Sequence, residues 1–222
     1  MQLIGQYDSP FTRRVGIVLQ RYALAFVHSP LSVWADAEQL ARYNPLRRVP
    51  TLVLDDGTAL VESWAILDVL DEWVGPERAL LPARGPVRQE GMRISALGSG
   101  LADKAVSLFY EPLLRDSPSR IWIERCHTQI RDTLDRLESE RAGRATDFWL
   151  GDSLSHADIA VACALRFTDE AHPGLFDPQR WPHLAAHSRR CEALPEFVAI
   201  SQPILVNVGK GDSAGQGETG GA

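Results

Sequence analysis

A change in hydrophobic pattern at about residue 80 constrains the fold of this chain more than any other feature. Before it, short apolar runs typical of strands alternate with stretches whose apolar residues recur at helical spacing. After it, only the helical spacing remains. Residues 75–86 include five glycines and prolines, a density that favours a linker. The pattern therefore predicts an α/β domain followed by an all-α domain.

The predicted limits are an α/β domain over residues 1–80, a linker over 81–86 and a helical domain over 87–208. Within the first domain we expect strands near 2–5, 25–28, 49–54 and 58–61, with helices after the first, second and fourth strands. An Asp-Gly pair at 56–57 stands between the last two strands, and this pair is a strong hairpin signal. The helical domain should contain helices at 87–114, 121–137, 155–170 and 182–192, and a short one near Pro195. The tail, 209–222, has six glycines in fourteen residues, so we expect it to be disordered.

Composition excludes several classes of protein. The formal net charge of -6 argues against a nucleic-acid-binding face. No apolar run approaches the roughly 20 residues of a membrane span. The N-terminus shows no secretory signal, and three widely spaced cysteines fit a reducing compartment, so a cytoplasmic protein is expected. We interpret the cysteines as buried thiols. His183 and His187 lack a third ligand, so we expect no metal site and place both on a surface helix.

Ser9 and Pro10 stand at the start of the first predicted helix. Serine is a preferred N-cap and proline a preferred first helical residue. A hydroxyl at this position faces free backbone N–H groups and the positive end of the helix dipole, which favours an anion. The simpler interpretation is an ordinary N-cap.

Pro50 begins an apolar strand, where proline normally weakens pairing. A cis bond before it would turn the backbone of Val49 outward, so that its N–H and C=O could pair with an extended ligand. The alternative is a proline on an edge strand. Glu62 and Ser63 directly precede the third helix, where we expect Ser63 to be the N-cap. Together they could receive the ammonium and carboxylate of an amino-acid end group, or they could be only a cap and a solvated acid.

Ser155 and Asp158 have the spacing of a capping box, flanked by apolar Leu154 and Ile159 at the staple positions. This motif predicts the start of a helix and has no catalytic meaning of its own.

Taken in order, these motifs resemble the glutathione S-transferase superfamily. The matching segments are Tyr7 to Val15, Asn44 to Leu52, Glu62-Ser63 and the Ser155–Asp158 box, and the resemblance covers about residues 1–205. It is closest to bacterial members with Ser-Pro-Phe in place of Cys-Pro. The resemblance implies a thioredoxin-like N-terminal domain that binds glutathione as co-substrate. It also implies a helical C-terminal domain that forms much of the second substrate's pocket, and a homodimer.

By this resemblance, the hydroxyl of Ser9 matches the family's hydroxyl that hydrogen-bonds the glutathione sulfur. Family roles carry over to five further positions. Val49 would pair with the cysteinyl backbone ahead of a cis Pro50, and Glu62 and Ser63 would hold the γ-glutamyl end. Arg48 would meet the glycyl part. Side chains at the acceptor site or at a partner contact follow by analogy of position: Phe11, Trp34, Asp103, Phe109, Tyr110 and Arg115. Tyr7 is a minor rival to Ser9.

The expected activity is attack by the glutathione thiolate on a small hydrophobic electrophile, as in detoxification. A free thiol has a pKa of ~8.5, and only its thiolate is a good nucleophile. Alternatives are a non-catalytic regulatory or binding protein with the same fold, and a glutathione-dependent peroxidase, isomerase or dehalogenase. The sequence does not identify the electrophile.

Overall fold

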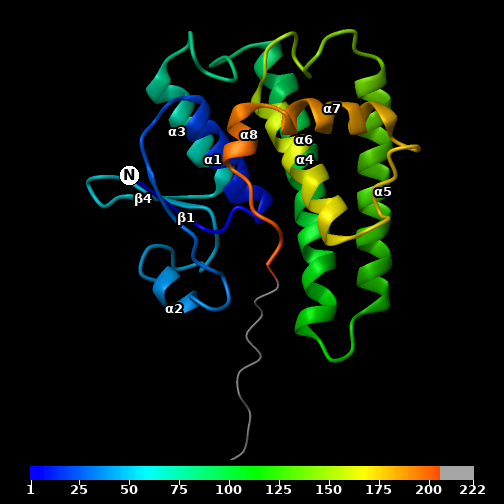
Figure 1. Ribbon diagram of the computed structural model, residues 1–222, viewed down its shortest axis with the longest axis horizontal. Helices are drawn as coiled ribbons and strands as arrows, with labels where there is room; N and C mark the ends of the chain where they lie inside the picture. The colour runs from blue at the N-terminus through cyan, green and yellow to red at the C-terminus, as the bar shows by residue number, and fades with distance from the viewer. Residues whose placement is uncertain (206–222) are drawn as a thin grey trace, which may run out of the picture.

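The computed structural model describes residues 1–205. The tail predicted at 209–222 lies outside the described residues. The elements run in the order β1 (Gln2–Ile4), α1 (Pro10–Arg21), β2 (Val27–Ser29), α2 (Ala37–Leu40), β3 (Thr51–Val53), β4 (Ala59–Val61) and α3 (Ser63–Val74). Helices α4 (Pro86–Leu114), α5 (Arg120–Ala142), α6 (His156–Ala171), α7 (Pro182–Glu192) and α8 (Pro195–Ala199) follow. The predicted class, an α/β domain followed by helices, is confirmed (Figure 1).

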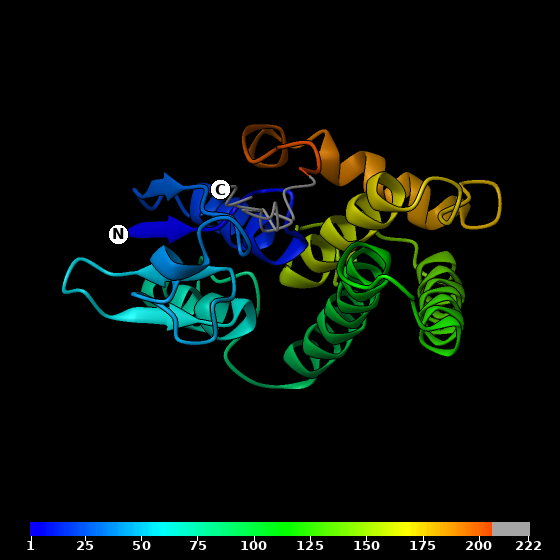
Figure 2. The ribbon, with the colours of Figure 1, turned by 90° about the horizontal axis from the view of Figure 1, so that it is seen from below.

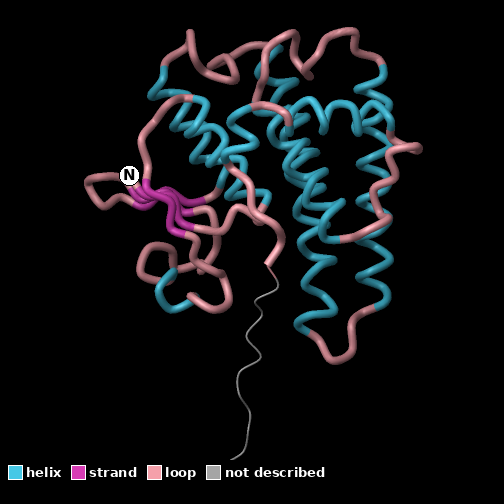
Figure 3. Tube along the Cα trace, viewed as in Figure 1, coloured by secondary structure: helices cyan, strands magenta, loops and turns pink. Residues whose placement is uncertain are grey.

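The four strands form one mixed sheet in the order β2-β1-β3-β4. Strand β1 pairs parallel with β2 and antiparallel with β3, and β3 and β4 form the predicted hairpin. Helices α1 and α3 lie on one side of the sheet and α2 on the other (Figures 1 and 3). The sheet's apolar residues and the inward faces of α1 and α3 share a core with part of α6. That shared core joins the two halves of the chain.

The helical half packs around α4 and α6, which lie between the sheet-containing half and α5 (Figure 2). Gly98 on α4 lies against the backbone of α6, where a Cβ would stand 2.9 Å from the carbonyl carbon of Ala160. The absence of a side chain at Gly98 therefore permits the close approach of these two helices. The predicted capping box of α6 is also confirmed, because Asp158 accepts from the backbone N–H of Ser155 at 2.8 Å.

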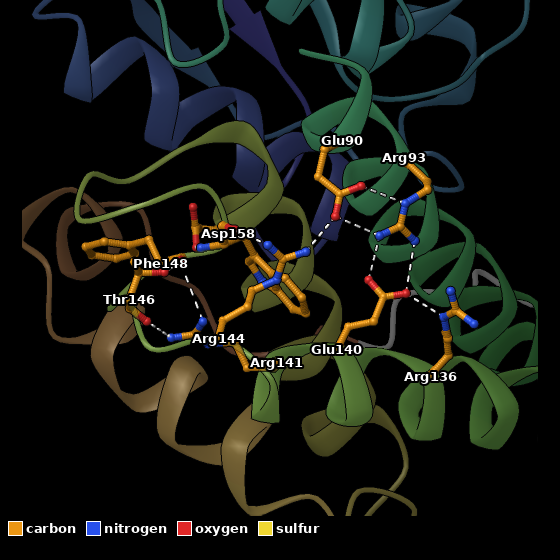
Figure 4. Close-up of polar contacts among 10 residues, drawn as sticks. Glu90, Arg93, Arg136, Glu140, Arg141, Arg144, Thr146, Phe148 and Asp158 are labelled. Carbon is orange, nitrogen blue, oxygen red and sulfur yellow. Dashed lines mark hydrogen bonds and ion pairs between the residues drawn. The ribbon is translucent and has the colours of Figure 1, made fainter. Parts of the chain in front are cut away.

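A network of ion pairs fastens α4 to α5 and to the loop that follows (Figure 4). Glu90 and Arg93 on α4 pair with each other at 2.9 Å, and Arg93 reaches Glu140 on α5 at 2.5 Å. Arg144 in the loop binds Glu90 at 2.5 Å. Helix α5 was predicted to end near residue 137 but continues to Ala142, because these charged side chains, and not an apolar stripe, hold its last turn.

Two further expectations were wrong. His187 is fully buried instead of lying on a surface, packed edge-on against Trp149 with ring centroids 5.9 Å apart. Glu62, and not Ser63, is the N-cap of α3, so Ser63 is the first helical residue. The three cysteines are buried free thiols, as expected.

Candidate functional site

Two adjoining cavities lie where the start of α1 meets the β4–α3 junction and α4. The larger has a volume of about 520 Å³ and the smaller about 100 Å³. Phe11, Arg48 and Val49 line both cavities, so one extended ligand could occupy the two together. The predicted binding residues divide between them, with Ser9 at the larger and Pro50, Glu62 and Ser63 at the smaller.

Ser9 is the N-cap of α1, as predicted, with Pro10 as the first helical residue. Its Oγ accepts a hydrogen bond from the backbone N–H of Thr12 at 3.3 Å. A hydroxyl that accepts through a lone pair still has its own proton to donate. That proton is available to an anion in the larger cavity, close to the positive end of the α1 dipole.

The Val49–Pro50 peptide bond is cis, as expected from the sequence. The loop before it is held by Asn44, whose Nδ2 donates to the Arg48 carbonyl at 2.9 Å. A Cβ at Gly5 would lie 2.7 Å from the Cβ of Val49. Glycine at position 5 therefore allows the β1–α1 turn to lie close against this loop. Among the described residues, no backbone hydrogen bond outside the helices and strands involves Val49, which leaves its polar groups available to a ligand.

Glu62 precedes α3 in a left-handed backbone conformation, with φ of 67°. A residue other than glycine adopts this conformation at a cost, and such residues cluster at binding sites. Its carboxylate pairs with Arg48 at 3.1 Å. Ser63 is 4% exposed at the floor of the smaller cavity. The N-terminus of α3 has no side-chain cap and no acid in its first turn, so within residues 1–205 its first N–H groups have no side-chain acceptor from these positions.

Five of the six side chains expected at the acceptor site or partner contact line the larger cavity: Phe11, Trp34, Asp103, Phe109 and Tyr110. The rings of Trp34 and Tyr110 meet edge to face with centroids 5.5 Å apart. Arg115 is not among the lining residues and instead pairs with Glu111 at 3.0 Å. Tyr7 does not line either cavity, and its ring stacks on His28 at 3.7 Å.

The sequence interpretation missed several residues that line these cavities, among them Asp8, Arg14, Ser99 and Leu205. Asp8 and Leu205 line the larger one, and Asp8 accepts from the Leu205 N–H at 3.0 Å. Burial raises the pKa of Asp8. Arg14 and Ser99 line the smaller cavity. Asp8 and Arg14 belong to the same Tyr7–Val15 segment as Ser9, but no local sequence pattern shows which way their side chains point.

No group of three or more His, Cys, Asp or Glu side chains in residues 1–205 is arranged to hold a metal ion. None of the helices in this part of the chain is long and apolar enough to cross a membrane.

Comparison with known proteins agrees with the fold. Residues 8–73 match the glutathione S-transferase N-terminal domain, and residues 120–190 match the glutathione S-transferase C-terminal domain. The chain belongs to the glutathione S-transferase family. A curated relative, the uncharacterized GST-like protein YibF of Escherichia coli, is 31% identical over 172 residues, which cover 75% of this chain and 81% of YibF.

Two solved structures are similar over nearly their whole length. A glutathione S-transferase from Methylobacterium radiotolerans, in complex with glutathione sulfonate, is 30% identical with a TM-score of 0.84, covering 92% of this chain and 97% of that one. A glutathione transferase family member from Pseudomonas fluorescens Pf-5, with bound glutathione, is 33% identical with a TM-score of 0.80. The match covers 91% of this chain and 99% of that one.

Proposed function

We propose that this protein is a glutathione transferase in which Ser9 stabilises the glutathione thiolate for attack on a small hydrophobic electrophile. The observation that supports this most strongly is the place of Ser9. Its hydroxyl caps α1 at the wall of the larger cavity, beside a smaller polar cavity formed by Val49, Glu62 and Ser63. The glutathione-bound relative from Pseudomonas fluorescens adds support.

Each residue has a separate task in this proposal. The carboxylate of Glu62 receives the γ-glutamyl ammonium, and Ser63 with the N-terminus of α3 receives the carboxylate. The N–H and C=O of Val49 pair with the cysteinyl backbone, ahead of the cis Pro50. Arg48, whose guanidinium pairs with Glu62 at 3.1 Å, orients that carboxylate and extends toward the glycyl end. Glutathione, when bound, supplies the thiol; Ser9 donates a hydrogen bond to its sulfur and takes no proton from it.

The larger cavity would receive the second substrate. Its wall carries the aromatic rings of Phe11, Trp34, Phe109 and Tyr110, which favour a small apolar or aromatic electrophile. We place the protein in the cytoplasm, with a role in detoxification. A homodimer is supported by exposed apolar side chains on α3 and α4, among them Trp64 at 62% and Val87 at 53% exposure.

The test compares Ser9→Ala with Ser119→Ala. Ser119 is also a serine N-cap, on α5, and it lines neither cavity. Ser9→Ala should lose most transferase activity and keep most of its glutathione affinity, whereas Ser119→Ala should keep wild-type activity. Wild-type rates for Ser9→Ala at neutral pH would refute the role of this hydroxyl.

Binding is tested separately by calorimetry. Glu62→Ala should weaken glutathione binding, and an unchanged dissociation constant would remove Glu62 from the site. Absence of any binding to the wild-type protein would favour a non-catalytic scaffold. Parallel assays with halogenated aromatics, epoxides, peroxides and isomerisable substrates distinguish transfer from the peroxidase, isomerase and dehalogenase reactions that use the same thiol.

A further inference from the structure

Residues 200–205 form an irregular strap that returns from α8 to the start of α1 (Figures 1 and 2). The strap begins at Ile200, which is 4% exposed in the core shared by the two halves of the chain. Ile200 lies against Gly16 of α1, where a Cβ would stand 2.9 Å from the Cγ2 of Ile200. The lack of a side chain at Gly16 therefore allows the strap to lie close against α1.

Two arginines hold the first half of the strap. Arg13 on α1 is 2% exposed, and its Nε donates to the carbonyl of Ile200 at 2.9 Å. Its two terminal nitrogens bind the carboxylate of Glu192 at 2.6 and 2.7 Å. Arg166 on α6 donates through Nη1 to the hydroxyl of Ser201 at 2.9 Å. These five residues line neither cavity, so they fix the start of the strap without forming part of the site.

The other half of the strap is fastened to the β1–α1 turn, directly before Ser9. The side-chain oxygen of Gln202 accepts from the backbone N–H of Tyr7 at 3.1 Å. The backbone N–H of Leu205 donates to Oδ2 of Asp8 at 3.0 Å. Within residues 1–205, residues 203–205 make no other hydrogen bond. The end of the strap is therefore held by one polar contact, the carboxylate of Asp8.

The carboxylate of Asp8 bonds backbone N–H groups and pairs with no cation of the described chain. No Lys, Arg or His nitrogen of residues 1–205 lies within 4.0 Å of it. Burial raises the pKa of Asp8, and hydrogen bonds from the backbone N–H groups of Leu205 and Ser9 oppose that shift. Glu170 on α6 has the same sign of charge and raises the pKa further. The Leu205 N–H therefore stabilises the ionised carboxylate, and the carboxylate in turn holds Leu205.

The end of the strap is a wall of the larger cavity. Ile204 and Leu205 line this cavity together with Asp8 and with the rings of Phe109 and Tyr110 on α4. Ile204 also packs against the apolar core of the helical half. The strap thus brings two aliphatic side chains from the far end of the described chain to the place where the second substrate would bind. A small electrophile would lose these contacts if the strap moved away.

We infer that Asp8 is a positioning residue for the second substrate: its carboxylate holds Ile204 and Leu205 in place as a wall of the larger cavity and so sets the affinity for small electrophiles. This inference rests on the proposed function and adds to it a residue that acts through the strap and does not touch the reacting atoms. Asp8 immediately precedes Ser9, so one turn carries both the donor for the sulfur and the anchor of this wall. Fixing both from one turn keeps the electrophile and the sulfur in a constant geometry, which favours attack.

Steady-state kinetics with chlorodinitrobenzene, at saturating glutathione and at a pH above the ionisation of the bound thiol, tests the inference. Asp8→Ala should raise KM for chlorodinitrobenzene about 3- to 10-fold, the range for losing one hydrogen bond, and leave kcat and the glutathione dissociation constant near their wild-type values. Asp8→Asn should restore a KM near that of the wild type, because its amide oxygen still accepts from the Leu205 N–H. Gln202→Ala loosens the strap at its other contact with the turn and should also raise KM.

Asp177→Ala is the matched control. Asp177 also accepts from a backbone N–H, that of Gln179 at 2.8 Å, and lines neither cavity. Its KM should equal the wild-type value. Hydrogen exchange, followed by mass spectrometry of the peptide that contains residues 203–205, should be faster in Asp8→Ala and unchanged in Asp8→Asn and Asp177→Ala. If Asp8→Ala does not fold, Gln202→Ala carries the same kinetic and exchange test.

A folded Asp8→Ala with unchanged KM and unchanged exchange overturns the role of Asp8 alone. A raised KM that Asp8→Asn does not restore, with no effect of Gln202→Ala, also overturns it, because the carboxylate would then act on the substrate directly. A wild-type protein that transfers glutathione to none of the electrophiles overturns the proposed function and this inference together.

Discussion

Replacing Gly98 by alanine tests whether α4 and α6 are in backbone contact. The added Cβ would stand 2.9 Å from the carbonyl carbon of Ala160 and 2.9 Å from the nitrogen of Val161. Both atoms belong to the backbone of α6, so no side-chain rotation relieves the contact, and the two helices must separate. Gly100, two residues further along α4, is the matched control because a Cβ there meets nothing within 4 Å.

The two variants should shift stability in opposite directions. Overpacking costs about 1–3 kcal/mol, and we take the upper end for Gly98→Ala because backbone faces backbone. Alanine stabilises a helix interior by about 1 kcal/mol relative to glycine, so the net effect of Gly98→Ala is a loss of about 2 kcal/mol in unfolding free energy. Gly100→Ala has no overpacking cost, so it should raise the unfolding free energy by about 1 kcal/mol. The difference of about 3 kcal/mol corresponds to about 6–12 °C in Tm for a chain of this size.

Urea and thermal unfolding of the two variants and the wild type measure this difference. The contact also matters for function, because α4 carries Asp103, Phe109 and Tyr110 into the larger cavity. Gly98→Ala should therefore also raise KM for the electrophile. Equal or same-direction shifts in the two variants would refute the close approach of α4 and α6.

Three further predictions concern stability and the second-substrate cavity. Hydrogen bonds from Arg93, and then from Arg144, lower the pKa of Glu90 to about 2; its stabilising effect is therefore present above the unfolded pKa of about 4.3 and is lost as pH falls toward 2. Glu90→Gln should cost about 1 kcal/mol at pH ~7 and almost nothing near pH ~2 in urea unfolding, and a pH-independent difference would contradict this. Ser155→Ala removes a hydroxyl that bonds Asp158 at 2.5 Å and should lower the unfolding free energy by about 1 kcal/mol; an unchanged urea midpoint would exclude that role. Phe109→Ala should raise KM for aromatic electrophiles severalfold and leave the glutathione dissociation constant unchanged. A weaker glutathione affinity with an unchanged KM for the electrophile would contradict a place for Phe109 in the second-substrate cavity.

The sequence predicts most of the element order because the signals involved are local. Ser9-Pro10 marks the start of α1, the Asp-Gly pair marks the β3–β4 hairpin, and Ser155 with Asp158 marks the start of α6. Each signal depends on residues within a few positions of one another. The sequence prediction ended α5 five residues too early, because Arg141 and its neighbours in the last turn are held by contacts with other segments of the chain.

The cavities could be predicted only in part, since their walls come from segments far apart in the chain. Arg13 and Arg14 are identical in type and adjacent in sequence, yet of these two Arg14 alone lines one of the two cavities described above. Leu205 reaches the larger cavity from the other end of the described chain. Arg115 was expected at the acceptor site or a partner contact, but it does not line the larger cavity and pairs with Glu111 near the end of α4. Side-chain direction at these positions depends on tertiary packing, which a single sequence does not show.

The pKa of the glutathione thiol bound to the protein tests the central claim most directly. Lowering it by two units requires about 2.7 kcal/mol of preferential stabilisation of the thiolate. A hydrogen bond to a charged group contributes about 1.5–3 kcal/mol and a helix N-terminus about 0.3–1 kcal/mol, which together reach that value. The thiolate's ultraviolet absorbance, followed against pH in the wild type and in Ser9→Ala, measures the shift. We predict a thiol pKa near ~6.5 in the wild type that returns by at least one unit toward ~8.5 in Ser9→Ala; the same pKa in both proteins would contradict the role of Ser9.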